Sequence, residues 1–211
     1  MDLGCGKGAV SVKLAASIKC KCYGIDGVSE FVESSKLKAR EYGVDTLCRF
    51  EVGDIRMKIE ELGKFDVIIF GATGPVFDDY STALTVLSKH LADEGIIIIE
   101  EGYIDETSEF QHPSYSSKKA LLSQFEKAGM ELIDEIECKY GEISDTEKEM
   151  EDLTKRCKQL KAKYPEKSSL FDNFMENQAS EFDALKNEME GSIMVLKKTC
   201  SILEQRSKCS E

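Results

Sequence analysis

The chain has 211 residues, of which 41% are hydrophobic and 32% charged, as is usual for a globular protein with a buried core. It contains 28 Lys and Arg and 40 Asp and Glu, which gives a net charge of −12. This charge argues against nucleic acid as a partner, because nucleic-acid binders present a basic surface. No apolar run reaches the ~18 residues of a membrane span, and the first residues do not resemble a secretory signal. We therefore expect a cytoplasmic protein with no membrane partner.

The first two thirds of the chain alternate predicted strands and helices. Helices are predicted over 9–18, 28–42, 76–91 and 118–128, and strands over 22–25, 47–52, 65–70, 95–100 and 130–138. In the first helix, Val10, Leu14 and Ile18 share one face. Such alternation predicts a parallel sheet with helices on both faces. Segments 65–70 and 95–100 are almost continuously apolar, as strands covered on both faces are.

The composition changes after residue 141. Residues 142–190 are highly charged, and apolar side chains recur every seven residues at Ile143, Met150, Cys157 and Tyr164, which predicts an amphipathic helix that Pro165 ends. A second helix follows and stops at Gly191. We expect one domain over residues 1–211, with a core (1–141), a helical insertion (142–190), the last strand of the sheet (191–198) and a charged tail (199–211).

Eight cysteines are scattered along the chain without a C-x-x-C pair, which predicts reduced thiols in a chain without a secretory signal. Cys20 and Cys22 form a C-x-C, whose side chains share a face if the segment is extended. A soft-metal or arsenic site is an alternative for this pair, although zinc sites usually show wider spacing. We predict no metal site.

The strongest motif lies at residues 1–8, which read MDLGCGKG, so that Gly4, Gly6 and Gly8 lead from a strand into a helix. The dinucleotide fingerprint G-x-G-x-x-G places a pyrophosphate at the helix N-terminus. Here the last glycine comes one residue early, and Asp2 precedes the loop. An acid would repel a pyrophosphate but suit an ammonium group, so the motif favours a zwitterionic amino-acid ligand.

Further candidates stand at the ends of the next strands. Asp26 is placed to accept both hydroxyls of a ribose, or alternatively to cap the following helix. Asp54 and Ile55 are placed to meet the amine and the ring of a purine, or form a plain turn. Phe70 and Gly71 end a strand at the carboxyl edge of the sheet, where open α/β sheets bind ligands.

The ordered motifs DLGCGKG, GID, VGD, FDVIIFGAT and LADEGIIIIEEGY resemble the class I S-adenosylmethionine-dependent methyltransferases. The resemblance covers residues 1 to about 138 and the strand near 192–198. It implies a Rossmann-like, doubly wound, mostly parallel sheet with an antiparallel last strand, here with a helical insertion before that strand. It also implies S-adenosylmethionine as the cofactor.

The same resemblance implies a set of cofactor-binding residues. Asp2, Gly4, Gly6 and Gly8 would surround the methionine end, Asp26 with Gly27 the ribose, Asp54 with Ile55 the adenine, and Phe70 with Gly71 the sulfonium. The chain departs from the family at its start, because only Met1 precedes Asp2. A fragment, a misassigned start and a truncated strand are all compatible with this departure, and truncation would open the site and weaken binding.

Methyl transfer requires an acceptor held about 3 Å from the methyl group, and a base only if the nucleophile must lose a proton early. Candidates in the segment after the strand 95–100 are Glu101, Tyr103 and His112. Solvated loop positions are the alternative for Glu101 and His112.

The sequence therefore predicts an S-adenosylmethionine-dependent methyltransferase with an unidentified, small-molecule acceptor. The main alternative is a non-catalytic protein of the same fold. It would bind S-adenosylmethionine, or it would bind a partner through its acidic helices. A nicotinamide-dependent oxidoreductase would require a different glycine loop. Helices 142–190 are expected to pack on the core, cap the acceptor site or form a homodimer.

Overall fold

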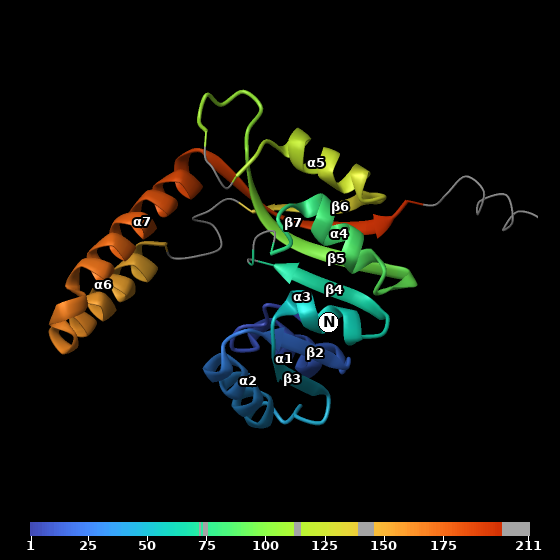
Figure 1. Cartoon of the computed structure of the whole chain (residues 1–211), viewed down its shortest axis with the longest axis horizontal. Coiled ribbons are helices and arrows are strands. Elements are labelled where there is room, and N and C mark those ends of the chain that lie inside the picture. Colours follow the sequence, from blue (N-terminus) through green and yellow to red (C-terminus); the bar gives the residue numbers. More distant parts are fainter. Residues whose placement is uncertain (72, 74–75, 112–114, 139–145, 200–211) are drawn as a thin grey trace, which may run out of the picture. The chain divides into compact units, whose positions relative to one another are not determined.

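The computed structural model describes the chain except for residues 72, 74–75, 112–114, 139–145 and 200–211 (Figure 1). The chain divides into two compact units. The first comprises Met1–Glu101, Leu121–Glu135 and Met194–Glu211, and the second comprises Gly102–Ala120 and Ile136–Ile193. The single domain expected over 1–211 stays a prediction.

Within the described residues, seven strands form one sheet in the order β3-β2-β1-β4-β5-β7-β6 (Figure 1). The strands are β1 (Asp2–Leu3), β2 (Cys22–Asp26), β3 (Cys48–Val52), β4 (Phe65–Gly71), β5 (Leu91–Ile104), β6 (Met130–Cys138) and β7 (Met189–Lys198). Strands β1 to β5 pair in parallel. The order reverses between β1 and β4, which is the switch point where such sheets bind ligands. The predicted mostly parallel Rossmann-like sheet with an antiparallel end is confirmed.

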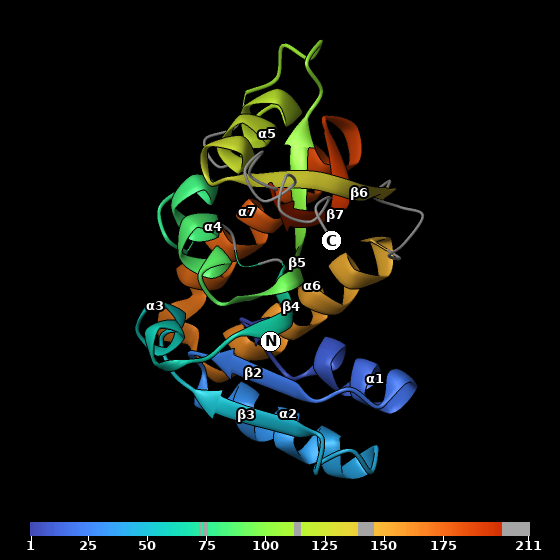
Figure 2. The same cartoon turned by 90° about the vertical axis from the view of Figure 1, so that its right-hand side faces the viewer.

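Helices connect the strands. They are α1 (Ala9–Ile18), α2 (Ser29–Glu41), α3 (Ile55–Lys58), α4 (Tyr80–Ser88), α5 (Lys118–Lys127), α6 (Thr146–Lys163) and α7 (Ser168–Asn187), with short 3-10 helices η1 (Ile59–Glu61) and η2 (Pro165–Lys167). Figure 2 shows α1 and α2 beside β2 and β3, against which they pack. None of the helices in the described part of the chain has the length and apolar character needed to cross a membrane.

Strand β1 is short but central. Asp2 is in register with Gly24 of β2 and with Ile69 of β4. The backbone of Met1 extends the pairing, because its nitrogen donates to the Val67 carbonyl at 2.6 Å and its carbonyl accepts from Ile69 at 2.8 Å.

The helix α1 has the predicted bounds but not the implied orientation. Val10 and Ile18 are 49% and 68% exposed, and the buried residues are instead Ser11, Val12 and Ala15. Of these smaller side chains, Val12 and Ala15 belong to an apolar cluster with Cys5, Val32, Ala39, Val44 and Phe50. The glycine at the start of α1 brings the helix close to α2, so small side chains fill the narrow space between them.

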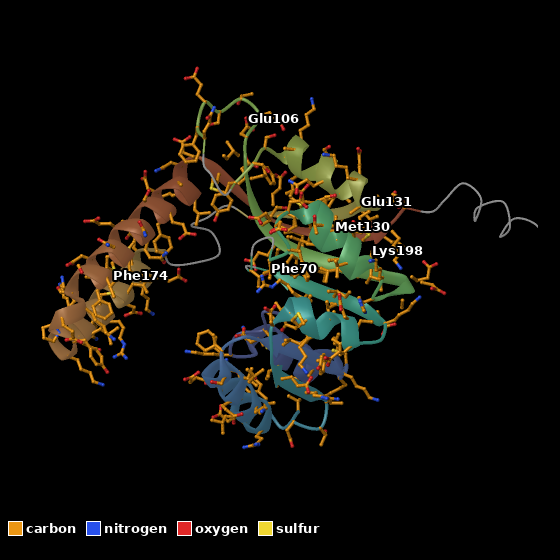
Figure 3. All side chains as sticks on the ribbon, viewed as in Figure 1. Phe70, Glu106, Met130, Glu131, Phe174 and Lys198 are labelled. Atoms are coloured by element: carbon orange, nitrogen blue, oxygen red, sulfur yellow. The ribbon has the colours of Figure 1, made fainter. Side chains whose placement is uncertain are left out.

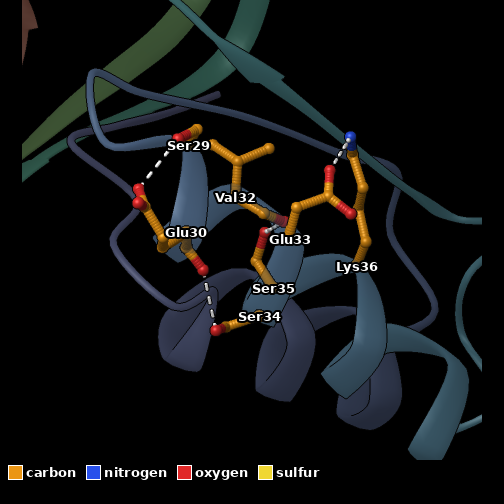
Figure 4. A network of polar contacts seen from close by, with 7 residues as sticks. All are labelled: Ser29, Glu30, Val32, Glu33, Ser34, Ser35 and Lys36. Carbon is orange, nitrogen blue, oxygen red and sulfur yellow. Dashed lines mark hydrogen bonds and ion pairs between the residues drawn. The ribbon is translucent and has the colours of Figure 1, made fainter.

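Several polar side chains of α2 bond to other groups of the same helix (Figure 4). The hydroxyl of Ser34 donates to the Glu30 carbonyl at 2.8 Å, and Lys36 pairs with Glu33 at 2.9 Å. On the buried side, the Ser35 hydroxyl donates to the Val32 carbonyl at 2.7 Å. A buried hydroxyl with a partner costs little, so this small residue can face the core.

Helix α4 is shorter than predicted at both ends. The carboxylate of Asp79 accepts from the backbone of Thr82 at 2.7 Å and so caps a helix that begins at Tyr80 rather than at residue 76. Leu91, expected as the last helical residue, is instead the first residue of β5. Tertiary pairing with β4, which begins with Phe65 opposite Leu91, overrides the apolar helical pattern there.

The end of the helical insertion also differs from the prediction. Helix α7 ends at Asn187 without a glycine, and the nitrogen of its C-cap residue Glu188 makes the last helical bond, to the Ala184 carbonyl at 2.9 Å. Strand β7 then begins at Met189 and runs through Gly191, which was expected to stop the helix. The predicted break at Pro165 is confirmed, since η2 separates α6 from α7. Ile143 lies outside the described residues.

The close approach at Gly8 yields a stability prediction. Gly8 has φ +71°, and a Cβ there would lie 2.7 Å from Ser35 Cβ and 3.2 Å from Phe50 Cζ. We expect Gly8→Ala to lower the free energy of unfolding by about 2–4 kcal/mol, from left-handed strain plus overpacking. Gly43 is the matched control, because it has φ +65° and nothing within 4 Å of its Cβ position. Gly43→Ala should cost only about 1–2 kcal/mol. Urea denaturation measures both, and equal losses would contradict the packing role.

Candidate functional site

The loop after β1 is a left-handed turn fixed to β2. Gly4, Gly6 and Gly8 have φ values of +69°, +53° and +71°, which only glycine adopts without strain. The nitrogens of Gly4 and Cys5 both donate to the Ile25 carbonyl, at 2.9 and 3.0 Å. The predicted turn between the first strand and α1 is therefore present.

The three glycines have different surroundings. A Cβ on Gly4 would overlap the side chain of Thr73, and one on Gly8 would overlap Ser35. At Gly6 and at Gly27, nothing lies within 4 Å of the Cβ position. Gly4 and Gly8 are thus required by packing, whereas Gly6 and Gly27 leave open space where a ligand can approach the backbone. This arrangement fits a cofactor held at the carboxyl ends of β1 and β2.

Asp26 joins the loop to the end of β2. Its Oδ2 accepts from the Gly6 nitrogen and its Oδ1 from the Val28 nitrogen, each at 2.8 Å. The cap position of α2 is Val28, so the alternative of Asp26 as the cap residue does not describe the structure. A carboxylate offers about four acceptor positions, so two remain after these bonds. Its role toward a ribose stays a prediction.

Asp2 lies beneath the loop. Its Oδ2 accepts from the Ser11 hydroxyl at 2.6 Å in a buried contact between β1 and α1. Burial raises the pKa of this carboxyl above its ordinary value, and the bond from Ser11 opposes that shift. Asp2 is therefore a structural link as well as the acid predicted to face the methionine end.

Asp54 caps α3 and is held by its own helix. Its carboxylate accepts from the Arg56 nitrogen at 2.9 Å and pairs with the Arg56 guanidinium at 2.6 Å. These bonds lower the pKa of Asp54. The next residue, Ile55, is buried. An adenine amine would have to share the Asp54 carboxylate with Arg56. The role of Asp54 and Ile55 toward adenine stays a prediction.

Phe70 and Gly71 differ in what they offer a ligand. Phe70 (Figure 3) is 1% exposed and its ring meets the Tyr80 ring edge-on at 6.3 Å, so its side chain belongs to the core. Gly71 ends β4 opposite Glu100 of β5, and its Cβ position lies 3.5 Å from Glu100 Oε2. A place near the sulfonium stays a prediction for both residues.

Glu101 is held by a residue that the sequence analysis missed. The Tyr80 hydroxyl donates to Glu101 Oε2, and the Tyr80 nitrogen donates to Gln124 Oε1 at 2.8 Å. The Tyr80 ring also packs edge-on against Phe125 at 6.2 Å. No sequence spacing connects position 80 with 101 or 124, because the sheet brings these segments together.

Tyr103 belongs to the second unit. It is 3% exposed, and its hydroxyl lies 3.2 Å from Lys118 Nζ and 3.4 Å from Glu137 Oε1. The Lys118 ammonium also lies 4.9 Å from the centre of the Tyr103 ring. His112 lies outside the described residues. The three predicted catalytic residues are thus not seen as one group.

Two further features of the described residues concern ligands. Helices α6 and α7 of the second unit border a groove of about 940 Å³, and no predicted cofactor residue lines it. Across the ranges described, no group of three or more His, Cys, Asp or Glu side chains is arranged to hold a metal ion.

Comparisons with known proteins bear on the family. A solved S-adenosylmethionine-dependent methyltransferase from Geobacter sulfurreducens, in complex with S-adenosyl-L-homocysteine, is 18% identical with a TM-score of 0.74 over 93% of this chain and 83% of its own. A cyclopropane synthase from Mycobacterium tuberculosis is 14% identical with a TM-score of 0.74 over 94% of this chain and 78% of its own. At these identities the likeness shows the fold alone.

A curated relative, described as an uncharacterized RNA methyltransferase of Clostridium tetani, is 44% identical over 61 residues. The match covers 29% of this chain and only 13% of that relative's length. A family model described as a methyltransferase domain matches residues 1–160. The chain therefore belongs to the methyltransferase-domain family, in agreement with the predicted methyltransferase.

Proposed function

We propose that this chain transfers the methyl group of S-adenosylmethionine to a small-molecule acceptor. The observation that carries the proposal is the contact between Gly6 and Asp26, which places an open backbone turn beside a carboxylate at the switch point of the sheet. The sulfonium of the cofactor supplies an activated methyl group. The chain has to bind the cofactor, orient the acceptor and exclude water.

The cofactor site in this proposal follows the carboxyl ends of the strands. Asp26 uses its two remaining acceptor positions for the ribose, while Gly6 and Gly27 leave room for the ligand against the backbone. Asp2 with the glycine loop receives the methionine end. The ends of β3 and β4 complete the site with Asp54, Ile55, Phe70 and Gly71.

On the acceptor side, Glu101 is the first candidate. The hydroxyl of Tyr80 donates to one carboxylate oxygen, which fixes the side chain near the carboxyl end of β5. Tyr103 is a weaker candidate, because its hydroxyl already lies beside Lys118 and Glu137.

RNA is the second candidate acceptor, favoured by the 61-residue match to the Clostridium relative. The net charge of −12 opposes it, because phosphate binding requires clustered cations. A non-catalytic protein that only binds the cofactor is the alternative in function. A homodimer through α6 and α7 stays a prediction.

Label transfer tests the proposal. We expect the full chain with methyl-labelled S-adenosylmethionine to label components of a cell-extract filtrate below about 3 kDa, and to leave purified total RNA unlabelled. S-adenosylhomocysteine formation measured in parallel reports turnover. Labelled RNA would move the acceptor to the second class, and tight S-adenosylhomocysteine binding without turnover on either fraction would favour the non-catalytic alternative.

The role of Asp26 has its own test. Asp26→Ala removes the acceptors for Gly6 and Val28 as well as those offered to the ribose, so we expect S-adenosylhomocysteine affinity to fall by about 10- to 100-fold. Isothermal titration measures the affinity. Asp45→Ala, which removes the same charge at an exposed position, is the control and should bind like the native chain. Unchanged affinity in Asp26→Ala would refute the ribose assignment.

The role of Asp2 predicts a pH dependence. Because burial raises the pKa of Asp2, the carboxylate that would pair with an ammonium is lost at a higher pH than for an exposed Asp. We expect S-adenosylhomocysteine affinity to fall as the pH is lowered from about 7 to 5. Asp2→Asn keeps an acceptor for Ser11 and should bind about tenfold more weakly at pH 7, with a flat profile. Equal slopes in the two proteins would count against this role.

The role of Glu101 is tested by separating turnover from binding. Glu101→Gln retains an acceptor for Tyr80, so the fold should persist while kcat on the labelled filtrate falls by about 10- to 100-fold. S-adenosylhomocysteine affinity should not change. Glu131→Gln, at an exposed position of β6 (Figure 3), is the control for removing a charge. A normal kcat in Glu101→Gln would remove this residue from the acceptor site.

A further inference from the structure

Three thiols meet where β2 and β3 begin. Cys20 follows Lys19, the C-cap residue of α1, while Cys22 opens β2 and Cys48 opens β3. Cys22 and Cys48 face each other in the parallel register of the two strands. All three side chains are only partly buried. This cluster lies at the amino ends of the strands, at the edge of the sheet opposite Asp26.

The closest pair is Cys20 and Cys22. Their sulfur atoms lie 3.7 Å apart. The Cys22 thiol donates to the Ser11 carbonyl at 3.3 Å, which fixes its sulfur beside α1. Either sulfur can donate in this pair, and the Cys20 sulfur is the one not held by the backbone of α1.

The cluster is not arranged as a metal site, because no group of three suitable ligands occurs among the described residues. It also differs from Cys5 and Cys157, which are buried. Two partly exposed sulfurs near van der Waals contact are instead the arrangement from which a disulfide forms with little movement. Bond formation requires an approach of about 1.7 Å, from 3.7 Å to ~2.05 Å, which side-chain rotation can supply.

We propose that Cys20 and Cys22 form a reversible dithiol that hydroperoxides convert to a disulfide. The Cys20 thiolate attacks the peroxide and breaks its O–O bond, which yields Cys20 sulfenic acid and hydroxide, or an alkoxide from an alkyl peroxide. The Cys22 thiol then displaces the sulfenic oxygen, forms the S–S bond and releases water. Two thiols are oxidised by two electrons, and one peroxide is reduced.

The order of attack follows from the surroundings. Burial, reinforced by the hydrogen bond shared with Cys20, raises the pKa of Cys22 to about 12, so this sulfur stays protonated. A thiol in that state is a poor first nucleophile but is placed beside the sulfenic acid that it resolves. Burial also raises the pKa of Cys48. The Cys20 sulfur, which is not held by the backbone of α1 as Cys22 is, is the one placed to react first.

Peptide mapping tests the proposal on the full chain. Trypsin cleaves after Lys19, Lys21 and Lys36, so reduced Cys20 and Cys22 fall into separate peptides, while a disulfide holds them together across the Lys21 cut. The reduced protein is treated with one equivalent of hydrogen peroxide, quenched with N-ethylmaleimide, digested and analysed by mass spectrometry. We expect the linked peptide to form about tenfold faster than any disulfide that contains Cys5 or Cys157. Dithiothreitol should reverse it.

Single substitutions identify the roles. Cys22→Ser should trap Cys20 as a sulfenic acid that reacts with dimedone, and Cys20→Ser should yield neither adduct nor linked peptide. Cys48→Ser is the matched control in the same cluster and should form the Cys20–Cys22 link at the native rate. Peptide mapping of the native protein is sufficient to test whether the Cys20–Cys22 disulfide forms. A dominant link between Cys22 and Cys48, or no linked peptide while the buried thiols oxidise equally fast, would overturn the proposal.

Discussion

The hydrogen bond from the Gly6 nitrogen to Asp26 Oδ2 is the contact on which the arrangement of the glycine loop and β2 depends. It exists only because β1 and β2 pair in parallel with Leu3 opposite Ile25, so that the Ile25 carbonyl also receives the nitrogens that open the loop. The positive φ of Gly6 turns its N–H toward β2. One short pairing thus sets the loop, the carboxylate and the open space beside them.

The packing behind the loop has to be tight for this contact to form. At Gly8 there is no room for a side chain between α1 and α2, because Ser35 of α2 lies directly against it. The side chain of Ser35 is small, and its hydroxyl donates to the Val32 carbonyl of the same helix. Phe50 fills the remaining space from β3. The motif glycines therefore serve two purposes, since Gly8 allows helices to approach while Gly6 leaves the backbone open.

The fold leaves the acceptor open. A methyltransferase and a cyclopropane synthase both share it with this chain at TM-scores of 0.74, although their sequences are only 18% and 14% identical to it. The same scaffold therefore carries proteins named for different products, and the acceptor must be read from side chains beyond the cofactor loop. In this chain the proposed candidates are Glu101, which bonds to Tyr80, and Tyr103, which lies beside Lys118 and Glu137.

The sequence by itself determined the alternation of elements, the glycine turn and the family, because these depend on local periodicity and on a motif of adjacent residues. Only the tertiary structure decided which face of α1 is buried, where α4 begins, and that Gly191 lies within a strand. It also brought Tyr80 to Glu101 and Cys20 to Cys22. Such contacts depend on strand register and side-chain direction, which arise when distant segments pair in one sheet.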